Sequence, residues 1–394
     1  MPEAGRGSAE VVVAGHVCLD VIPALSEPVA LEPGRLVFAG PAALSTGGAV
    51  ANVGLALHRL GVPVRLLGKV GNDVFGRAFR DALGGVDPQL ADGISIVDGE
   101  DTSYSIVISP PRTDRTFVHS PGANDTFAAD DVGAEHLAGA RVLHFGYPPL
   151  MRRTYEDGGA SLLRLFLRAQ AAGLVTSLDL CEFDPDRAAG RADWAGFLQR
   201  VLAGVDIFAP SLGELTLMLD GRRMSPGDAR LDRAVLARLA ERALALGASV
   251  VVIKLAEQGL YLRTTSDPDP LTRMGAALGV NGEVWRAREV LAPCFEARSI
   301  AGTTGSGDAT IAGLLAALLR GEDPVAAATS AAAVGACSVE APDATGGIRP
   351  WSEVRSRLAG GWPRLTLGPS LLAEGAWQCD DNGTLFDPEK EKTL

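Results

Sequence analysis

Residues 301–319 read A-G-T-T-G-S-G-D-A-T-I-A-G-L-L-A-A-L-L, a glycine-rich turn followed by an apolar stretch. From Asp308 onward, the apolar residues recur at the period of a helix that buries one face. Gly321 then supplies a natural helix stop. The backbone N–H groups of Gly305, Ser306 and Gly307 would lie at the N-terminus of this helix, where partial positive charge and free donors favour an anion. The turn therefore suits a phosphoryl group that is being transferred.

Asp308 admits two interpretations. A carboxylate is a poor phosphate ligand, so it can instead accept the proton of the nucleophile that attacks phosphorus. Alternatively, Asp308 simply caps the helix, which is a common use of aspartate. We favour the catalytic interpretation.

The composition limits which classes of protein this chain can belong to. The chain has 394 residues, of which 47% are hydrophobic and 21% charged, as expected for a globular chain with a large core. A net charge of −12 argues against a nucleic-acid partner. The N-terminus lacks a basic region followed by an apolar run, and no stretch has the length of a membrane span. We therefore expect a cytoplasmic protein without a membrane partner. The five cysteines show no spacing typical of zinc sites.

Short β-rich runs alternate with longer helical stretches along the chain. Several of these runs are continuously apolar, which is typical of strands covered on both faces. The fold class is therefore α/β, with a mostly parallel central sheet between helix layers. The predicted strands cover residues 11–15, 64–68, 141–145, 175–180, 206–209 and 250–255.

Other segments differ from this pattern. Residues 102–109 and 115–120 alternate polar and apolar side chains and read as a hairpin with one solvated face. Together with residues 17–25 and 36–39, they predict a small projecting sheet. Residues 265–284 and the tail from about residue 360 look irregular, and residues 380–394 look like a loosely held end.

A second glycine-opened helix is predicted at residues 47–61, G-G-A-V-A-N-V-G-L-A-L-H-R-L-G. Asn52 lies among its apolar residues, where a buried amide must find partners and suits a polyhydroxylated ligand. The alternative is an Asn52 satisfied by neighbouring backbone. Asp20, just after the first strand, lies where open α/β sheets bind ligands, or else it forms an ordinary Asx-turn.

Two motifs together carry a family resemblance. Residues 47–76, which end in G-K-V-G-N-D-V-F-G, resemble the N-terminal signature of the ribokinase-like, or PfkB, carbohydrate kinases, and G-T-T-G-S-G-D-A resembles their C-terminal signature. The resemblance runs from about residue 11 to residue 348. It implies a Rossmann-like ribokinase fold with a β-sheet lid, and ATP-dependent phosphorylation of a sugar's primary hydroxyl. Residues 1–359 would form the kinase domain, with lid segments at about 17–46 and 100–122, and residues 360–394 a partly irregular C-terminal extension.

The resemblance also implies roles for individual residues. Asp308 looks like the catalytic base beside the anion hole of Gly305, Ser306 and Gly307. The positions that hold the sugar are matched by Asp20, Gly47, Gly48 and Asn52.

The nucleotide side of the motif shows departures from the family. P-S-L-G-E resembles the family's N-x-x-E motif, which helps to place Mg²⁺ and phosphate; Glu214 is retained, to act through water, but Ser211 replaces the usual Asn. Lys254 and Thr304 are assigned to ATP, although Lys254 stands where the family often has Thr and can equally cap the strand end. Gly302 replaces an Asp associated with a monovalent-cation site, so potassium activation is doubtful.

The substrate remains open between a sugar and, as second choice, a nucleoside. A phosphosugar is less favoured because Ala49, which is not basic, follows the double glycine, although Arg112 or Arg115 on the hairpin could replace a basic residue there. A catalytically silent regulator that binds sugar or nucleotide on the same fold is a further alternative. Pairing of two lids in a homodimer is expected to cover the exposed sheet.

Overall fold

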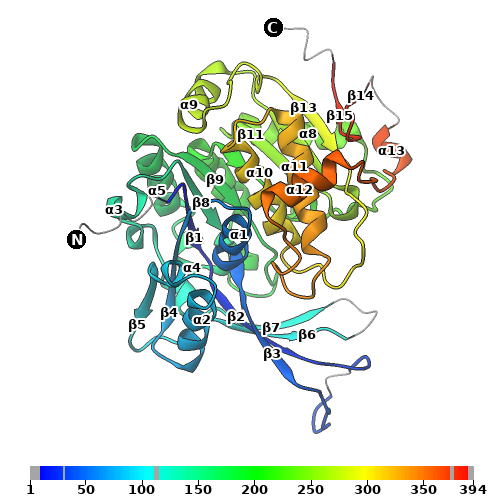
Figure 1. The fold of residues 1–394 in the computed structure, drawn as a ribbon. Helices are drawn as coiled ribbons and strands as arrows, with labels where there is room; N and C mark the ends of the chain where they lie inside the picture. Colours follow the sequence, from blue (N-terminus) through cyan, green and yellow to red (C-terminus); the bar gives the residue numbers. More distant parts are fainter. Residues whose placement is uncertain (1–8, 30–31, 111–114, 373–376, 389–394) are drawn as a thin grey trace, which may run out of the picture.

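The computed structural model describes residues 9–29, 32–110, 115–372 and 377–388 (Figure 1). Within these residues, eleven strands form one large sheet and four form a smaller one. In spatial order, the large sheet consists of β14 (Gln378–Cys379), β15 (Leu385–Phe386), β13 (Glu289–Ala292), β12 (Leu260–Thr264), β11 (Val250–Lys254), β10 (Ile207–Phe208), β9 (Val175–Asp179), β8 (Val142–Gly146), β1 (Val11–Gly15), β4 (Val64–Gly71) and β5 (Ile94–Val97).

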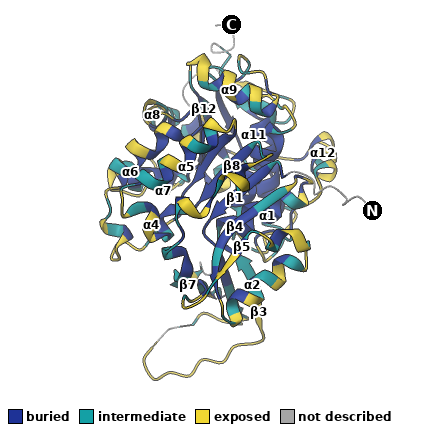
Figure 2. Cartoon of the chain, turned by 90° about the vertical axis from the view of Figure 1, so that its left-hand side faces the viewer, coloured by how far each residue is buried: buried dark blue, intermediate teal, exposed yellow. Residues whose placement is uncertain are grey.

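The parallel part of this sheet confirms the predicted α/β class. All neighbours from β5 through β11 pair in parallel, whereas the pairs from β11 to β14 are antiparallel. The strands β1 and β8 are buried along their whole length, as Figure 2 shows for the centre of the sheet. Burial on both faces explains why these strands lack alternation.

Helices cover both faces of the large sheet (Figure 1). One hydrophobic cluster joins the sheet to α1 (Gly48–Arg59), α2 (Val74–Gly84), α9 (Pro268–Leu278), α10 (Ser306–Leu318), α11 (Pro324–Ser338) and α12 (Trp351–Ala359). A second cluster, on the other face, includes residues of α3 (Ala134–Leu137), α5 (Ala160–Ala171), α6 (Trp194–Val201), α7 (Leu212–Asp220), α8 (Arg233–Ala245) and α13 (Pro369–Leu372), with α4 (Arg152–Tyr155) at its edge. No helix of the described residues is long and apolar enough to cross a bilayer.

The smaller sheet is the predicted projecting sheet, and we call it the lid. Its order is β3 (Ala42–Gly47), β2 (Cys18–Pro23), β6 (Tyr104–Ile108), β7 (Thr116–Ser120), and it extends away from the body in Figure 1. The hairpin of β6 and β7 is antiparallel as expected. The strand expected at residues 36–39 is wrong. β2 instead pairs with Ala42–Gly47 and ends at Pro23, so residues 36–39 have no strand to pair with.

Two segments expected to be irregular are ordered. α9 begins after Asp267, whose side chain accepts from the Asp269 N–H at 3.0 Å, and ends at Gly279 with φ +73°. Proline, aspartate and glycine within this helix obscured its apolar face of Leu271, Met274 and Leu278. The described part of the tail adds β14 and β15 to the large sheet, because β15 pairs with β13. The expected loose end from residue 380 is therefore wrong for its described part, residues 380–388.

Candidate functional site

The turn before α10 has the geometry expected of an anion site. Gly305 is the residue before the helix and adopts φ +71°, a conformation that side chains rarely tolerate. A Cβ there would also lie 2.5 Å from the Cβ of Ala344. Ser306 and Gly307 form the first turn of the helix, where N–H groups have no intrahelical acceptor, and the Ser306 N–H makes only a long hydrogen bond of 3.4 Å to the Thr303 carbonyl oxygen. Glycine is thus required at 305 for both conformation and space.

Asp308 lies inside this helix and does not cap it. Gly305 occupies the cap position and no side chain caps the helix, so the capping interpretation of Asp308 is wrong. Asp308 is 2% exposed, and its carboxylate accepts one hydrogen bond from Asn52 and one bifurcated hydrogen bond from Tyr147. The Asn52 Nδ2 donates to Oδ2 at 2.9 Å, and the Tyr147 hydroxyl lies 2.9 Å from Oδ1 and 2.8 Å from Oδ2. Asn52 is therefore satisfied by a distant carboxylate rather than by neighbouring backbone.

The protonation states around Asp308 suit a base. Burial raises the pKa of the Asp308 carboxyl, although the Lys254 ammonium and the hydrogen bonds from Asn52 and Tyr147 oppose this rise. A raised pKa makes a carboxylate a better proton acceptor. Burial and the nearby Asp308 charge raise the pKa of Tyr147 well above its ordinary value, so Tyr147 stays a donor.

Lys254 lies beside the same helix N-terminus. Its Nζ would be 3.3 Å from a Cβ placed on Gly307, and it donates to the Asp179 Oδ1 at 2.7 Å. Burial by itself lowers the pKa of Lys254, but the carboxylates of Asp179, Glu214 and Asp308 outweigh it and raise this pKa, so the ammonium stays charged. Lys254 therefore places a buried positive charge beside the N-terminus of α10.

Ser211 and Glu214 cap a helix together. Ser211 precedes α7, and its hydroxyl accepts from the Glu214 N–H at 3.2 Å, while Glu214 Oε2 accepts from the Ser211 N–H at 2.7 Å. This reciprocal pair is a capping box. Ser211 also bridges to Lys254 in the sheet, which brings Glu214 to the Lys254 side of the site. Thr304 lies partly buried in the turn before α10.

The predicted sugar residues gather where the lid meets α1. A Cβ on Gly47 would lie 2.5 Å from the Asp20 Oδ2, and one on Gly48, at φ +82°, would lie 2.7 Å from the His16 Nδ1. Both glycines therefore allow close approach of polar side chains to the backbone. Burial raises the pKa of Asp20 to about 6, against the hydrogen bonds from Cys18 and Ser105 and the charge of Arg115.

Several site residues were missed in the sequence. Tyr147 and Asp179 lie at the carboxyl ends of β8 and β9, which is where open α/β sheets place ligand-binding groups, and that position was their available signal. The rings of His16 and His119 contact each other at a tilt of 43°, with centroids 5.4 Å apart. Burial lowers the pKa of both histidines, so they are neutral. Both ring nitrogens of His16 are buried without a partner in the described structure.

One lid residue also reaches the turn before α10. Arg115, just before β7, donates from Nη2 to the Thr303 hydroxyl at 2.9 Å. The other arginine considered in the hairpin, Arg112, lies outside the described residues. Gly302, in the same turn, has the Pro342 carbonyl oxygen 2.9 Å from the position of a Cβ.

A family model and several relatives match the chain. The model described as pfkB family carbohydrate kinase covers residues 8–351. Fructokinase-1 from Zea mays is 31% identical over 178 residues, which is 44% of this chain and 51% of that protein. The matches to the plant fructokinases thus span about half of their length.

Two solved structures share the fold. Arabidopsis thaliana ribokinase complexed with ribose and ATP superposes with a TM-score of 0.65 at 20% identity, covering 89% of this chain and 98% of that one. A putative ribokinase II from E. coli in complex with ATP and Mg²⁺ gives 0.66 at 20% identity, covering 89% and 99%. Both likenesses confirm the ribokinase fold.

Proposed function

Because the chain belongs to the PfkB family of carbohydrate kinases, we propose that it transfers the γ-phosphoryl group of ATP to a primary hydroxyl of a sugar. The observation that carries the proposal is the Asp308 carboxylate, buried beside the N-terminus of α10 and oriented by Asn52 and Tyr147. Asp308 accepts the proton of the attacking hydroxyl, and the N–H groups of Ser306 and Gly307 meet the charge on the phosphoryl group.

Lys254 is proposed to contact the nucleotide phosphates. Its ammonium adjoins Gly307, and phosphate is a preferred partner of a charged lysine. Thr304 would contribute from the same turn. Asp179 fixes the position of the ammonium through the 2.7 Å ion pair.

Magnesium fits this donor set as an ion shared with ATP. In the described residues, no group of three or more histidine, cysteine or acidic side chains is arranged to hold a metal. Mg²⁺ is commonly held by one or two carboxylates plus substrate phosphates and water, so Glu214 would act through water. Bound there, Mg²⁺ would neutralise phosphate charge.

The sugar would lie between the lid and α1. Asp20 and Asn52 supply hydrogen-bonding groups there, and Gly47 and Gly48 leave the backbone open to close approach. The unpartnered nitrogens of His16 favour a neutral hydroxylated ligand, because a neutral imidazole both donates and accepts.

The assay is ADP release across pentoses, hexoses, nucleosides and phosphosugars. We expect turnover with an unphosphorylated sugar. Turnover with a nucleoside alone would assign a nucleoside kinase. Measurable ligand binding without turnover of any compound would identify a silent regulator and contradict the proposal.

A second copy of the chain is proposed to cover the lid. Leu44, Phe117 and Val118 are 59%, 50% and 47% exposed on its edge strands, and exposed apolar side chains on strand edges favour pairing. Light scattering should give the mass of a dimer, and Phe117→Ser should shift it towards a monomer. A monomeric wild type at micromolar concentration would contradict this arrangement.

A further inference from the structure

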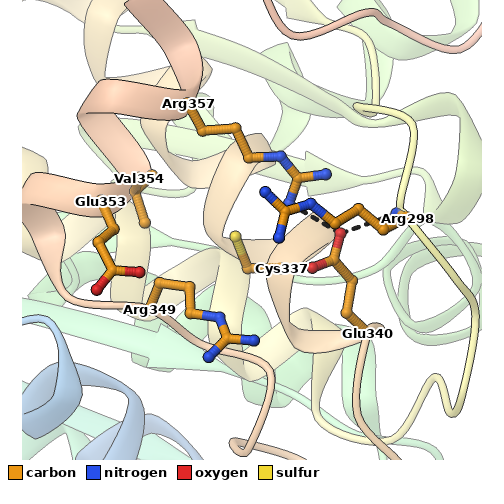
Figure 3. A pocket seen from close by; sticks show the side chains of 7 residues that line it. All are labelled: Arg298, Cys337, Glu340, Arg349, Glu353, Val354 and Arg357. Atoms are coloured by element: carbon orange, nitrogen blue, oxygen red, sulfur yellow. Dashed lines mark hydrogen bonds and ion pairs between the residues drawn. The ribbon is translucent and has the colours of Figure 1, made fainter. Parts of the chain in front are cut away.

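A cavity of about 340 Å³ lies near the end of α11, away from Asp308. Its walls come from α12 and the residues just before it, from the end of α11 and the residues that follow it, and from the segment before the turn at residues 301–307 (Figure 3). Three arginines line it, Arg298, Arg349 and Arg357. This concentration of positive charge stands out on a chain with a net charge of −12.

One arginine is neutralised and held in place. Arg357 Nη1 donates to the Glu340 Oε1 at 2.8 Å, and this oxygen also accepts from the Arg298 backbone N–H at 2.9 Å. The Arg357 guanidinium further lies 3.4 Å from the ring centroid of Trp362. These contacts fix the Arg357 group before any ligand arrives.

The other two arginines are not neutralised. In the described structure, neither the Arg298 nor the Arg349 side chain has a hydrogen bond or an ion pair, and the exposed Glu353 at the same cavity has none either. Burial raises the pKa of the Cys337 thiol to about 11, so this side chain adds no negative charge near neutral pH. The lining thus carries three guanidinium groups, two of them exposed, against the carboxylates of Glu340 and Glu353, and a bound anion would offset the excess positive charge.

The arrangement suits a tetrahedral anion. In Figure 3, Arg357 on α12 and Arg349 just before α12 approach the cavity from one segment, and Arg298 approaches it from the loop opposite. Guanidinium groups form forked, charge-assisted hydrogen bonds with phosphate oxygens. A planar carboxylate offers two oxygens, whereas a phosphate group offers oxygens in three directions and can therefore contact all three arginines at once.

The cavity is also connected to the turn before α10. Val339, between the lining residues Cys337 and Glu340, accepts hydrogen bonds through its carbonyl oxygen from Ala301 at 2.9 Å and Gly302 at 3.4 Å. Arg298 lies three residues before Ala301 in the chain. A ligand that holds these walls therefore also restrains the start of the phosphate-binding turn.

We propose that this cavity binds a compact phosphate-bearing anion, and that its occupancy steadies residues 301–307. The competing explanation is that the arginines merely offset the partial negative charge at the C-terminus of α11. The two explanations differ in whether added phosphate binds at these side chains.

The test is calorimetric titration of inorganic phosphate and, separately, glucose 6-phosphate into the full chain. We expect Arg298→Gln and Arg349→Gln each to weaken binding by about tenfold or more, since each removes a charged donor. Arg349→Lys keeps the charge but loses the forked hydrogen bonds, so its affinity should lie between those of the wild type and Arg349→Gln. Arg355→Gln is the matched control, because it removes the same charge from α12 outside the cavity and should bind like the wild type. Whichever of the two compounds binds more tightly indicates whether the cavity prefers free phosphate or a phosphate ester.

Hydrogen exchange tests the coupling. Phosphate should slow exchange of the amides of residues 301–307 in the wild type but not in Arg349→Gln. Equal slowing in both proteins would place the phosphate in the turn itself and overturn the proposal. Failure of the wild type to bind either compound, or equal affinity in all variants, would overturn it as well.

Discussion

Asp308 and Asp20 differ in how deeply they are buried and in how far the surrounding residues already satisfy their hydrogen bonds. Asp308 is 2% exposed and already accepts hydrogen bonds from α1 and from the residue after β8. Asp20 lies on the lid and is only partly buried, with the Cys18 thiol 3.5 Å from its Oδ1. Next to it, Gly47 lies against the Asp20 carboxylate and Gly48 against the unpartnered Nδ1 of His16. The comparison indicates that the Asp308 end of the proposed site is already assembled by hydrogen bonds within the protein, whereas the Asp20 end, where we propose that the sugar binds, is incomplete.

The largest expected effect is at the assembled end. Asp308→Asn removes the proton acceptor but keeps the shape, so kcat should fall by about 10²–10⁴-fold, the usual contribution of general-base catalysis. ATP should still bind, as calorimetry can show. Near-normal turnover would remove Asp308 from the mechanism.

Asp20→Asn should act on binding at the incomplete end. Losing one charged hydrogen-bond acceptor should raise KM for the sugar by roughly tenfold to a hundredfold, with a smaller change in kcat. In the wild type, KM should rise as the pH falls below about 6, because Asp20, whose pKa is about 6, then becomes protonated. Steady-state kinetics from pH 5 to 8 should show this rise in the wild type and not in the variant. A fall in kcat with KM unchanged would contradict the assignment.

Tyr147→Phe should disturb the assembled end mildly. The hydroxyl hydrogen bonds stabilise the Asp308 carboxylate, so their loss raises the pKa of Asp308 further. The rate falls as pH falls through this pKa, because catalysis needs the carboxylate. The acidic limb of the kcat profile should therefore move to higher pH in the variant, and a limb at the wild-type position would show that Tyr147 does not act through Asp308.

The smallest expected effect concerns the monovalent cation. Cation sites are built from oxygen ligands, and Gly302 supplies no carboxylate near Pro342. Replacing potassium with tetramethylammonium at constant ionic strength should leave kcat unchanged. Strong potassium activation would contradict this expectation and would show that backbone carbonyl oxygens alone can bind a monovalent cation at this turn.

The sequence predicted those features that depend on local patterns. Short β-rich runs identified β1, β8 and β9, and the glycine-opened helices α1 and α10 followed from their period. Local patterns failed where a strand's existence depends on its neighbour. Residues 36–39 look apolar yet pair with nothing, whereas β15 is two residues long and forms because β13 offers a free edge.

By itself, the sequence determined the α/β class, the family and the two glycine turns, because each lies in contiguous residues. The tertiary structure decided the role of Asn52, whose amide meets Asp308 across 256 residues of chain. It also decided the ion pair between Asp179 and Lys254. Among the residues that follow strands, it is Tyr147 whose hydroxyl reaches the Asp308 carboxylate. Such contacts depend on where separate elements end in space, which side-chain periodicity does not encode.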